Sequence, residues 1–272
     1  MKTALTIAGF DPSSGAGVTA DLMVFAAHGL FGTSTITSLT VQSTVGVASS
    51  HPVDAEIVGQ TLRCLEQDLP AAGIKIGMLA TAPVVEAVAA FVAEVRERRA
   101  GVTIVLDPVL RSSSGRELLD SPGVERLRSQ LLPLVDWVTP NLDELALLTG
   151  QPIAGREQLA EAALLLHDEI LRQGTRVHVL AKGGHLEGAA DDLLLTPDGE
   201  LHWLAGERIE TKATHGTGCA LSSALLCRLL LGDAPLAAAQ SAKRYVEGAL
   251  RNAVPLGQGR GPMHHLWPLR RS

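Results

Sequence analysis

The segment Thr214-His215-Gly216-Thr217-Gly218-Cys219 runs directly into the strongly apolar residues 220–231. Two glycines just before an apolar helical pattern predict a tight turn whose backbone N–H groups converge at the helix N-terminus, where they can bind an anion. In a phosphoryl transfer, N–H dipoles fixed there stabilise the charge that spreads over the oxygens of the moving group. The residues alone support an anion site and a purely structural glycine turn about equally.

Cys219 falls in the first turn of this predicted helix. The positive end of the helix dipole lowers the pKa of a thiol at such a position and favours the thiolate. A Cys219 thiolate could accept the proton of an attacking hydroxyl group. The alternative is a buried cysteine with a structural role.

Short runs rich in Val, Ile, Leu and Thr alternate with longer helical patterns over the rest of the chain. The runs are Leu5–Ala8, Thr35–Val41, Ile74–Ile76, Thr103–Leu106, Trp137–Thr139 and Val177–Ala181. The helical patterns cover about residues 17–29, 54–68, 81–99, 121–132, 141–149 and 156–173. Strands that alternate with helices predict βαβ units and an α/β fold whose mostly parallel sheet is covered on both faces.

The second half of the chain departs from this alternation. Asp191–Thr196 and Glu200–Leu204 flank Pro197-Asp198-Gly199, which is a hairpin signal and predicts an added antiparallel pair. Helical patterns at 217–231 and 235–253 then close the chain, separated by a Gly-to-Pro break. We find no linker or repeat, so residues 1–272 are predicted to form one domain.

Composition excludes several classes of protein. The 272 residues carry a net charge of −6 without a basic stripe and include only three Trp, one Tyr and four Phe, which argues against a nucleic-acid partner. Three cysteines without C-x-x-C spacing argue against a disulfide framework and a zinc site. The uncharged stretch between Asp21 and Asp54 is rich in Ser, Thr and Gly, so it predicts sheet and pocket wall rather than a membrane span. A soluble cytoplasmic protein is expected.

The segment from Gly9 to Gly17, followed by Thr19-Ala20-Asp21, comes after a predicted strand and opens a helix. In an open α/β sheet, ligands bind beyond the carboxyl ends of the strands. The segment is neither a G-x-G-x-x-G fingerprint nor a phosphate-binding P-loop. Asp21 either serves a binding site or complements the dipole of its helix.

Further polar residues follow three other predicted strands. Asn141 with Glu144 resembles a capping box, and the pair could instead reach a phosphate-bound magnesium through water. Lys182 could meet nucleotide phosphate or be an exposed strand-end lysine. Asp107 could face the metal or only begin a turn. His264 and His265 are expected not to be metal ligands, since no carboxylate stands at metal spacing from them.

Taken together, these segments resemble the hydroxymethylpyrimidine/phosphomethylpyrimidine kinases. The resemblance rests on Thr6-Ile7-Ala8-Gly9, Asp11-Pro12, Gly15-Ala16-Gly17, Ala20-Asp21, Thr40–Thr44, Lys75–Leu79, Asp107-Pro108-Val109, Thr139–Leu142 with Glu144, Lys182–His185, Thr214–Cys219 and Gly261–His265. Each match is weak alone, but they occur in order and cover nearly the whole chain. The resemblance implies a ribokinase-like, three-layer α/β/α sandwich.

The resemblance also implies an activity. ATP with Mg²⁺ would phosphorylate 4-amino-5-hydroxymethyl-2-methylpyrimidine, and then its monophosphate to the diphosphate, for thiamine biosynthesis. A homodimer is implied as well. The nearest rival is a pyridoxal or pyridoxine kinase of the same fold, which can also carry Cys at the base position. A non-catalytic pyrimidine sensor would be expected to lose the anion turn or Cys219, and both are present.

The family's functional residues map onto matching positions of this chain. Cys219 would be the base, with Gly216 and Gly218 forming the anion hole. Lys182, Asn141 and Thr217 would serve the nucleotide, and Asp107 and Glu144 the metal. The residues expected in the pyrimidine pocket are Gln42, Asp21, Gly9, Met78 and Val109. Of these, Gln42 would hydrogen-bond the pyrimidine, since its amide offers both a donor and an acceptor.

Two positions depart from the family pattern. Ser14 stands where many relatives have glycine, which should matter little unless the position needs a positive φ. Arg111 is unexpected in the segment after Val109, and it could add a positive charge near the second phosphate. The chain ends soon after the kinase motifs, so no fused thiamine-phosphate synthase domain is expected.

Overall fold

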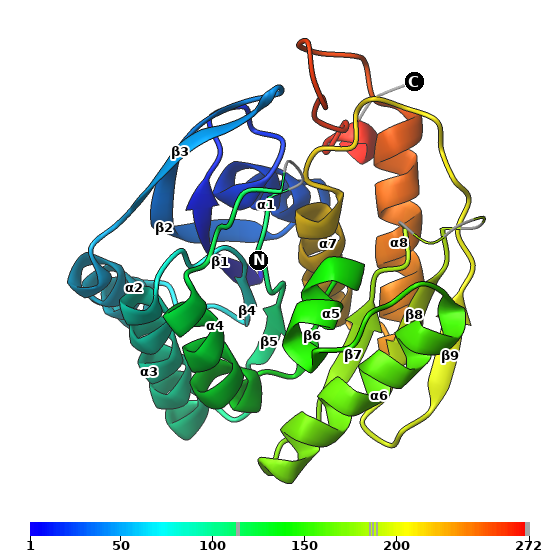
Figure 1. Cartoon of the computed structure of the whole chain (residues 1–272). Coiled ribbons are helices and arrows are strands. Elements are labelled where there is room, and N and C mark those ends of the chain that lie inside the picture. Colours follow the sequence, from blue (N-terminus) through cyan, green and yellow to red (C-terminus); the bar gives the residue numbers. More distant parts are fainter. Residues whose placement is uncertain (113–114, 185, 187, 189, 270–272) are drawn as a thin grey trace.

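The computed structural model describes residues 1–112, 115–184, 186, 188 and 190–269. In this part of the chain, nine strands form one sheet in the order β3-β2-β1-β4-β5-β6-β7-β8-β9 (Figure 1). The strands are β1 (Thr3–Phe10), β2 (Phe31–Ser43), β3 (Gly46–Pro52), β4 (Gly73–Ile76), β5 (Thr103–Leu106), β6 (Trp137–Val138), β7 (His178–Ala181), β8 (Asp192–Leu195) and β9 (Leu201–Leu204).

The centre of the sheet is parallel and both of its edges are antiparallel. Strands β2, β1, β4, β5, β6 and β7 pair in parallel. At one edge β3 runs antiparallel to β2, and at the other β8 and β9 form the hairpin predicted from Pro197-Asp198-Gly199. Gly199 has a φ of +84°, which explains the glycine at the end of that turn.

Helices cover both faces of the sheet, and the expected three-layer α/β/α sandwich is confirmed (Figure 1). The helices are α1 (Gly17–Ala27), α2 (Ala55–Asp68), α3 (Ala82–Arg98), α4 (Ser121–Arg126), α5 (Leu142–Thr149), α6 (Arg156–Arg172), α7 (Thr217–Leu231) and α8 (Pro235–Arg251). Helices α1, α7 and α8 share one apolar core, while α2, α3, α5 and α6 share the other.

Strand β5 shows why the central strands have no polar face. Ile104 and Leu106 belong to the core under α2, α3 and α6, and Val105 between them belongs to the core under α7 and α8. Successive side chains of a strand point to opposite faces, so both faces need apolar residues when both are covered. Helix α7 lies against β4 and β5, and Ala220, Ala224 and Leu225 are fully buried there.

Two elements differ from the sequence-based prediction. Strand β3 was not predicted as a separate strand, because its half-exposed sequence Gly46–Pro52 lacks an apolar alternation and ends in proline. The helical pattern at 121–132 divides into α4 and a π-helical turn, Leu127–Leu131. Pro133 follows closely, and a proline disfavours helix at the residue before it.

Strand β1 is the point where the chain changes direction across the sheet, with β2 on one side and β4 on the other. The carboxyl ends of β1, β4, β5, β6 and β7 therefore lie along one edge of the sandwich, and ligand sites of open α/β sheets form there. No helix in the described ranges has both the length and the apolar character needed to cross a bilayer.

Candidate active site

The glycine turn before α7 has the geometry expected of an anion site. Gly216 is the N-cap residue of α7, in the left-handed region with a φ of +79°. A Cβ atom on Gly216 would lie 1.9 Å from the carbonyl oxygen of Gly15, so no other residue fits. No side chain caps α7 in the described structure, which leaves the first N–H groups of the helix, at Thr217, Gly218 and Cys219, for a ligand.

Lys182 lies at this same helix N-terminus. Its Nζ atom donates a hydrogen bond of 2.7 Å to Asp107 Oδ1 and lies 3.7 Å from Glu144 Oε2. A Cβ atom on Gly218 would come within 3.0 Å of Lys182 Nζ, so the glycine allows the ammonium group to approach the turn. The structure thus brings together residues predicted from four separate segments.

Burial and charge oppose one another around Lys182. Burial, opposed by Lys182 and aided by the neighbouring Asp107, raises the pKa of Glu144 to about 7. Burial also raises the pKa of Asp107, but Lys182 and Lys75 together hold it below its ordinary value. Burial lowers the pKa of Lys182, yet the two carboxylates outweigh burial and raise it. Lys182 is therefore a permanent positive charge beside the turn.

Asn141 and Glu144 form the predicted capping box of α5. The Asn141 N–H donates to Glu144 Oε2 at 2.8 Å, and the Glu144 N–H donates to Asn141 Oδ1 at 2.9 Å. The structural interpretation of this pair is confirmed. The Glu144 Oε2 atom that accepts from the Asn141 N–H is also the oxygen 3.7 Å from Lys182 Nζ, so one oxygen serves both the cap and the ion pair.

The expected low pKa of Cys219 is wrong for the unliganded protein. Burial, together with the charges of Asp107 and Asp21, raises the pKa of the Cys219 thiol to about 11. The ammonium group of Lys75 is the strongest opposing influence. The end of α7 therefore does not offset the burial of the thiol, and Cys219 is a neutral thiol at pH 7 before substrates bind.

Asp21 lies beneath the site rather than on its wall. It is fully buried and accepts hydrogen bonds from Thr6 Oγ1 at 2.5 Å, Ser223 Oγ at 2.7 Å and Lys75 Nζ at 2.9 Å. The predicted contact of Asp21 with the pyrimidine is not supported, because all of its surface is covered by protein. Its partner is a lysine, so complementing the helix dipole is not its main role either.

Lys75 is a functional candidate that the residue patterns did not single out. It is fully buried in β4 and its charge is paired with Asp21. Burial lowers the pKa of Lys75, but Asp21 and then Cys219 outweigh burial and raise it. The sequence did hold a signal, since a lysine in the otherwise apolar strand Gly73–Ile76 requires a buried acidic partner.

The remaining pocket candidates lie at the ends of β1, β2, β4 and β5. A Cβ atom on Gly9 would lie 2.9 Å from Met78 Sδ, so these two residues are in contact. Val109 is half-buried and follows Asp107 at the end of β5. The roles of Gly9, Met78, Val109 and Gln42 toward a ligand stay predictions.

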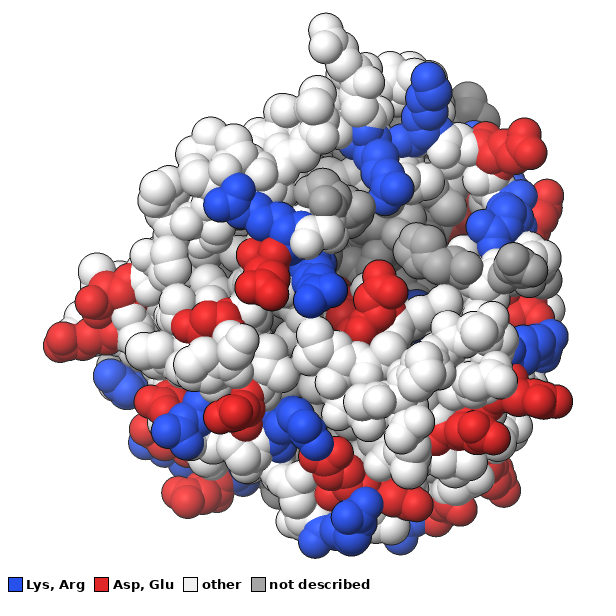
Figure 2. All heavy atoms as spheres, viewed as in Figure 1, with Lys and Arg blue, Asp and Glu red and all other residues white. Residues whose placement is uncertain are grey.

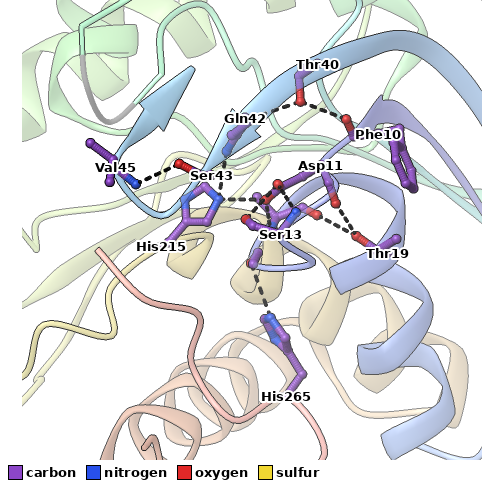
Figure 3. A network of polar contacts seen from close by, with 12 residues as sticks. Phe10, Asp11, Ser13, Thr19, Thr40, Gln42, Ser43, Val45, His215 and His265 are labelled. Carbon is purple, nitrogen blue, oxygen red and sulfur yellow. Dashed lines mark hydrogen bonds and ion pairs between the residues drawn. The ribbon is translucent and has the colours of Figure 1, made fainter. Parts of the chain in front are cut away.

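His215, inside the glycine turn, connects the end of β1 with β2. Its Nε2 atom lies 2.7 Å from Asp11 Oδ2 and 2.9 Å from the carboxamide of Gln42 (Figure 3). His265 lies below the same loop, with its Nε2 atom 3.2 Å from the Gly15 carbonyl oxygen. Neither contact was predicted, because the histidine and its partners are far apart in the sequence.

Ser14 has a φ of +59°, so this position does need the left-handed conformation that glycine adopts easily. The exception stated for Ser14 therefore applies, and the departure from the family pattern introduces local strain.

Arg111 pairs with Glu117 at the base of a short flap. The two residues form an isolated antiparallel bridge, and Arg111 Nη2 lies 3.9 Å from Glu117 Oε1. A cavity of about 680 Å³ lies between Ser43–Ala48 and the flap residues Gly115 and Arg116. The proposed effect of Arg111 on a second phosphate stays a prediction. Ser113 and Ser114 of this segment, and His185 of the Lys182–His185 motif, lie outside the described residues.

The face of the molecule seen in Figure 1 is hollowed near its middle, and side chains of both charges border the hollow (Figure 2). The described residues contain no group of three or more His, Cys, Asp or Glu that could hold a metal ion by itself.

The sequence and fold are similar to known kinases. A hydroxymethylpyrimidine/phosphomethylpyrimidine kinase of Haemophilus influenzae is 38% identical over 269 residues, covering 97% of each chain. The Rhizobium meliloti protein of the same name is 43% identical over 266 residues, covering 96% of each chain.

Solved structures agree on the fold. A Bacillus subtilis pyridoxal kinase in an ADP complex aligns with a TM-score of 0.85 at 30% identity, covering 97% of each chain. A Clostridium difficile phosphomethylpyrimidine kinase aligns with a TM-score of 0.75 at 33% identity, covering 92% of this chain and all of its own. The family model described as phosphomethylpyrimidine kinase matches residues 11–264. The chain belongs to the phosphomethylpyrimidine kinase family.

Proposed function

We propose that this protein transfers the γ-phosphoryl group of ATP to 4-amino-5-hydroxymethyl-2-methylpyrimidine and then to the resulting monophosphate, for thiamine biosynthesis. The observation that carries the proposal is the convergence of Gly216, Cys219 and Lys182 at the N-terminus of α7, within a chain of the kinase family. Fixed N–H groups, a lysine and a proton acceptor at one point are what a phosphoryl transfer requires.

On the nucleotide side, Lys182 would neutralise phosphate charge, and Asn141 and Thr217 would lie beside it. Asp107 and Glu144 fit a magnesium ion that arrives with the nucleotide, since magnesium keeps several waters and takes most of its ligands from phosphates and one or two carboxylates. Bound magnesium would draw negative charge away from the phosphate oxygens. Glu144, whose pKa is raised to about 7 by burial, would be more fully ionised beside such a cation.

On the acceptor side, the first step needs removal of the proton of the 5-hydroxymethyl group. The proposal assigns this to Cys219, and the raised pKa of its thiol means that the thiol must be helped to lose its own proton. Lys75, buried in β4, favours the thiolate by its charge, and Asp21 fixes Lys75 in position. In the second step the acceptor is a phosphate oxygen, which is already deprotonated at neutral pH, so that step needs no base.

The test is an ATP-turnover assay with hydroxymethylpyrimidine, its monophosphate and pyridoxal offered separately. Turnover with both pyrimidines and little with pyridoxal is expected. Preference for pyridoxal would keep the site chemistry and move the function to vitamin B6 salvage. Silence with all three acceptors would contradict the kinase assignment and favour a pyrimidine sensor.

Pyridoxal phosphorylation is the second candidate, because pyridoxal kinases align with this chain at TM-scores up to 0.86. Curated relatives of higher identity, up to 43% among those given above, carry the pyrimidine kinase name and favour the pyrimidine.

We further propose a homodimer that works in the cytoplasm. Leu39, Val41 and Val45 on and beside β2 expose half or more of their surface, which supports an apolar contact between copies. Cys64, Cys219 and Cys227 are all free thiols, as expected in a reducing compartment.

A further inference from the structure

The ring nitrogen Nε2 of His215 lies within hydrogen-bond distance of two polar side chains. This atom is 2.7 Å from Asp11 Oδ2 and 2.9 Å from the nearer polar atom of the Gln42 carboxamide. Figure 3 shows Gln42 and Asp11 approaching the ring from different segments. One nitrogen carries at most one hydrogen, so the partners decide whether that nitrogen donates or accepts.

Asp11 acts only as an acceptor. Its carboxylate accepts from the Ser13 N–H at 2.8 Å, the Ser13 hydroxyl at 2.7 Å and the Ala16 N–H at 2.9 Å. Burial raises the pKa of Asp11, but the hydrogen bonds from His215 and Ser13 outweigh burial and hold it below its ordinary value. Since an ionised carboxylate has no hydrogen to give, the hydrogen in the short contact belongs to His215 Nε2.

This assignment settles the direction of the Gln42 carboxamide. An N–H group of His215 meets a favourable partner only if the amide oxygen faces it. The other polar atom of the amide lies 3.2 Å from Thr40 Oγ1, and in this orientation it is the nitrogen of the NH₂ group. Thr40 Oγ1 already donates to the Phe10 carbonyl at 2.9 Å, so it is free to accept. Carboxamide ends are distinguished by such networks. In this orientation no two donors face one another, and Asp11 and the Gln42 oxygen share the single Nε2 hydrogen of His215.

The position of His215 is itself fixed by its surroundings. Its backbone N–H donates to the Gly261 carbonyl at 3.1 Å, and it forms an isolated parallel bridge with Pro262. Its ring packs so closely on Gly15 that a Cβ atom there would lie 2.2 Å from Cδ2. Only 13% of its side chain is exposed. The ring therefore has little freedom to leave Gln42.

We propose that His215 is a positioning residue that fixes the Gln42 carboxamide with its oxygen toward His215 and its NH₂ toward Thr40, and so selects the substrate edge. This inference rests on the proposed function. One oxygen lone pair and one N–H of Gln42 stay free, in a fixed order. They match an amino group beside a ring nitrogen acceptor, as a carboxamide matches the adenine edge. A rotated amide would present the opposite order.

The test compares the aminopyrimidine substrate with its 4-oxo analogue in the lactam form, which has a ring N–H beside a carbonyl. The measured quantity is the ratio of kcat/KM for the amino and oxo compounds. The wild-type protein should prefer the amino compound by roughly 10- to 100-fold. His215→Leu, which gives no N–H to Gln42, should reduce the ratio to within about threefold. His215→Gln, which keeps an N–H donor, should restore most of it.

Asp11→Asn provides a second variant that leaves the ring in place. An asparagine amide can donate to His215, which lets Nε2 accept from Gln42 and reverses the carboxamide, so the ratio should fall here too. Circular dichroism of each variant confirms folding. An unchanged ratio in folded His215→Leu, with turnover retained, overturns the inference alone. A wild-type protein that phosphorylates neither pyrimidine overturns the proposed function and this inference with it.

Discussion

Cys219, the proposed base, combines two properties that oppose one another. It stands at the start of a helix whose dipole favours the thiolate, and it lies deep enough that burial raises the pKa of its thiol to about 11. At pH 7 a thiol with this pKa is ionised in about one molecule in ten thousand. In its proposed role as the base, the thiol would therefore lose its proton on the way to the transition state, with the charge of Lys75 stabilising the thiolate.

The two phosphorylation steps should differ in their need for Cys219. Cys219→Ser should lower kcat for the alcohol acceptor by about 10²- to 10⁴-fold, the usual contribution of a general base. The step that starts from the monophosphate should fall much less, because its acceptor oxygen carries no proton to remove. Substrate KM should change little in both steps. Single-turnover measurements with each acceptor separate the two rates.

The second acceptor serves as the internal control for this variant. Equal losses in both steps would mean that Cys219 shapes the anion turn rather than moving a proton. A loss of less than about threefold in the first step would assign the base elsewhere.

The sequence allowed the polar residues of this site to be located, but not all of their partners. Gly216, Gly218 and Lys182 could be predicted because strand ends of a parallel sheet gather at one edge. Asp21 was placed on the pocket wall, and the structure buries it against Lys75. The sequence alone does not show which side of a helix meets a lysine from another strand, so the pair needed the fold.

At the scale of elements, helix α7 begins and ends on glycine for different reasons. Gly216 at its start has a φ of +79° and Gly232 at its end a φ of +101°. A Cβ atom on Gly216 would overlap the Gly15 carbonyl, whereas one on Gly232 would meet nothing within 4 Å. A side chain at Gly232 would thus meet backbone strain alone. A side chain at Gly216 would meet backbone strain and a steric overlap.

Alanine substitutions at the two ends of α7 should separate these effects. Gly232→Ala should lower the free energy of unfolding by about 1–2 kcal/mol, the cost of a left-handed alanine, and leave kcat unchanged. Gly216→Ala should lower it by more and also reduce kcat, because the turn must move away from Gly15. Urea unfolding and turnover of both variants provide the comparison. Equal stability losses with unchanged kcat would contradict a role for the turn in binding phosphate.

Most elements could be predicted because their patterns were unambiguous. The prediction of helix at 217–231 matches α7 residue for residue, and that of strand at Thr103–Leu106 matches β5. Strand β3 was missed because an edge strand with one open side needs neither apolar alternation nor a full ladder of donors. Its pairing with β2 is a long-range contact that local patterns do not encode.

At the scale of the whole molecule, titratable groups also lie at the amino ends of the central strands. The edge opposite the candidate active site holds a cavity of about 290 Å³ lined by Asp136, Trp137 and His178, among others. The rings of Trp137 and His178 are stacked with centroids 4.0 Å apart. Burial lowers the pKa of His178 to about 4, so the histidine is neutral in the folded chain at pH 7.

This histidine should make the molecule sensitive to acid between pH 6.5 and pH 4. Below pH 6.5, His178 binds a proton in the unfolded chain but not in the folded chain, so the free energy of unfolding falls as the pH falls. The shift from 6.5 to about 4 corresponds to about 3 kcal/mol. Partial exposure of His178 reduces this to roughly 2 kcal/mol.

His178→Phe keeps the stacking on Trp137 and removes the titration. Between pH 7 and pH 4, the free energy of unfolding of this variant should therefore fall by roughly 2 kcal/mol less than that of the wild type. Urea unfolding at both pH values measures this difference, with the exposed His51→Phe as a control that should retain the wild-type loss. If His178→Phe loses as much stability as the wild type, the acid sensitivity arises from other buried groups, such as His28 and His265, whose pKa values are also lowered by burial.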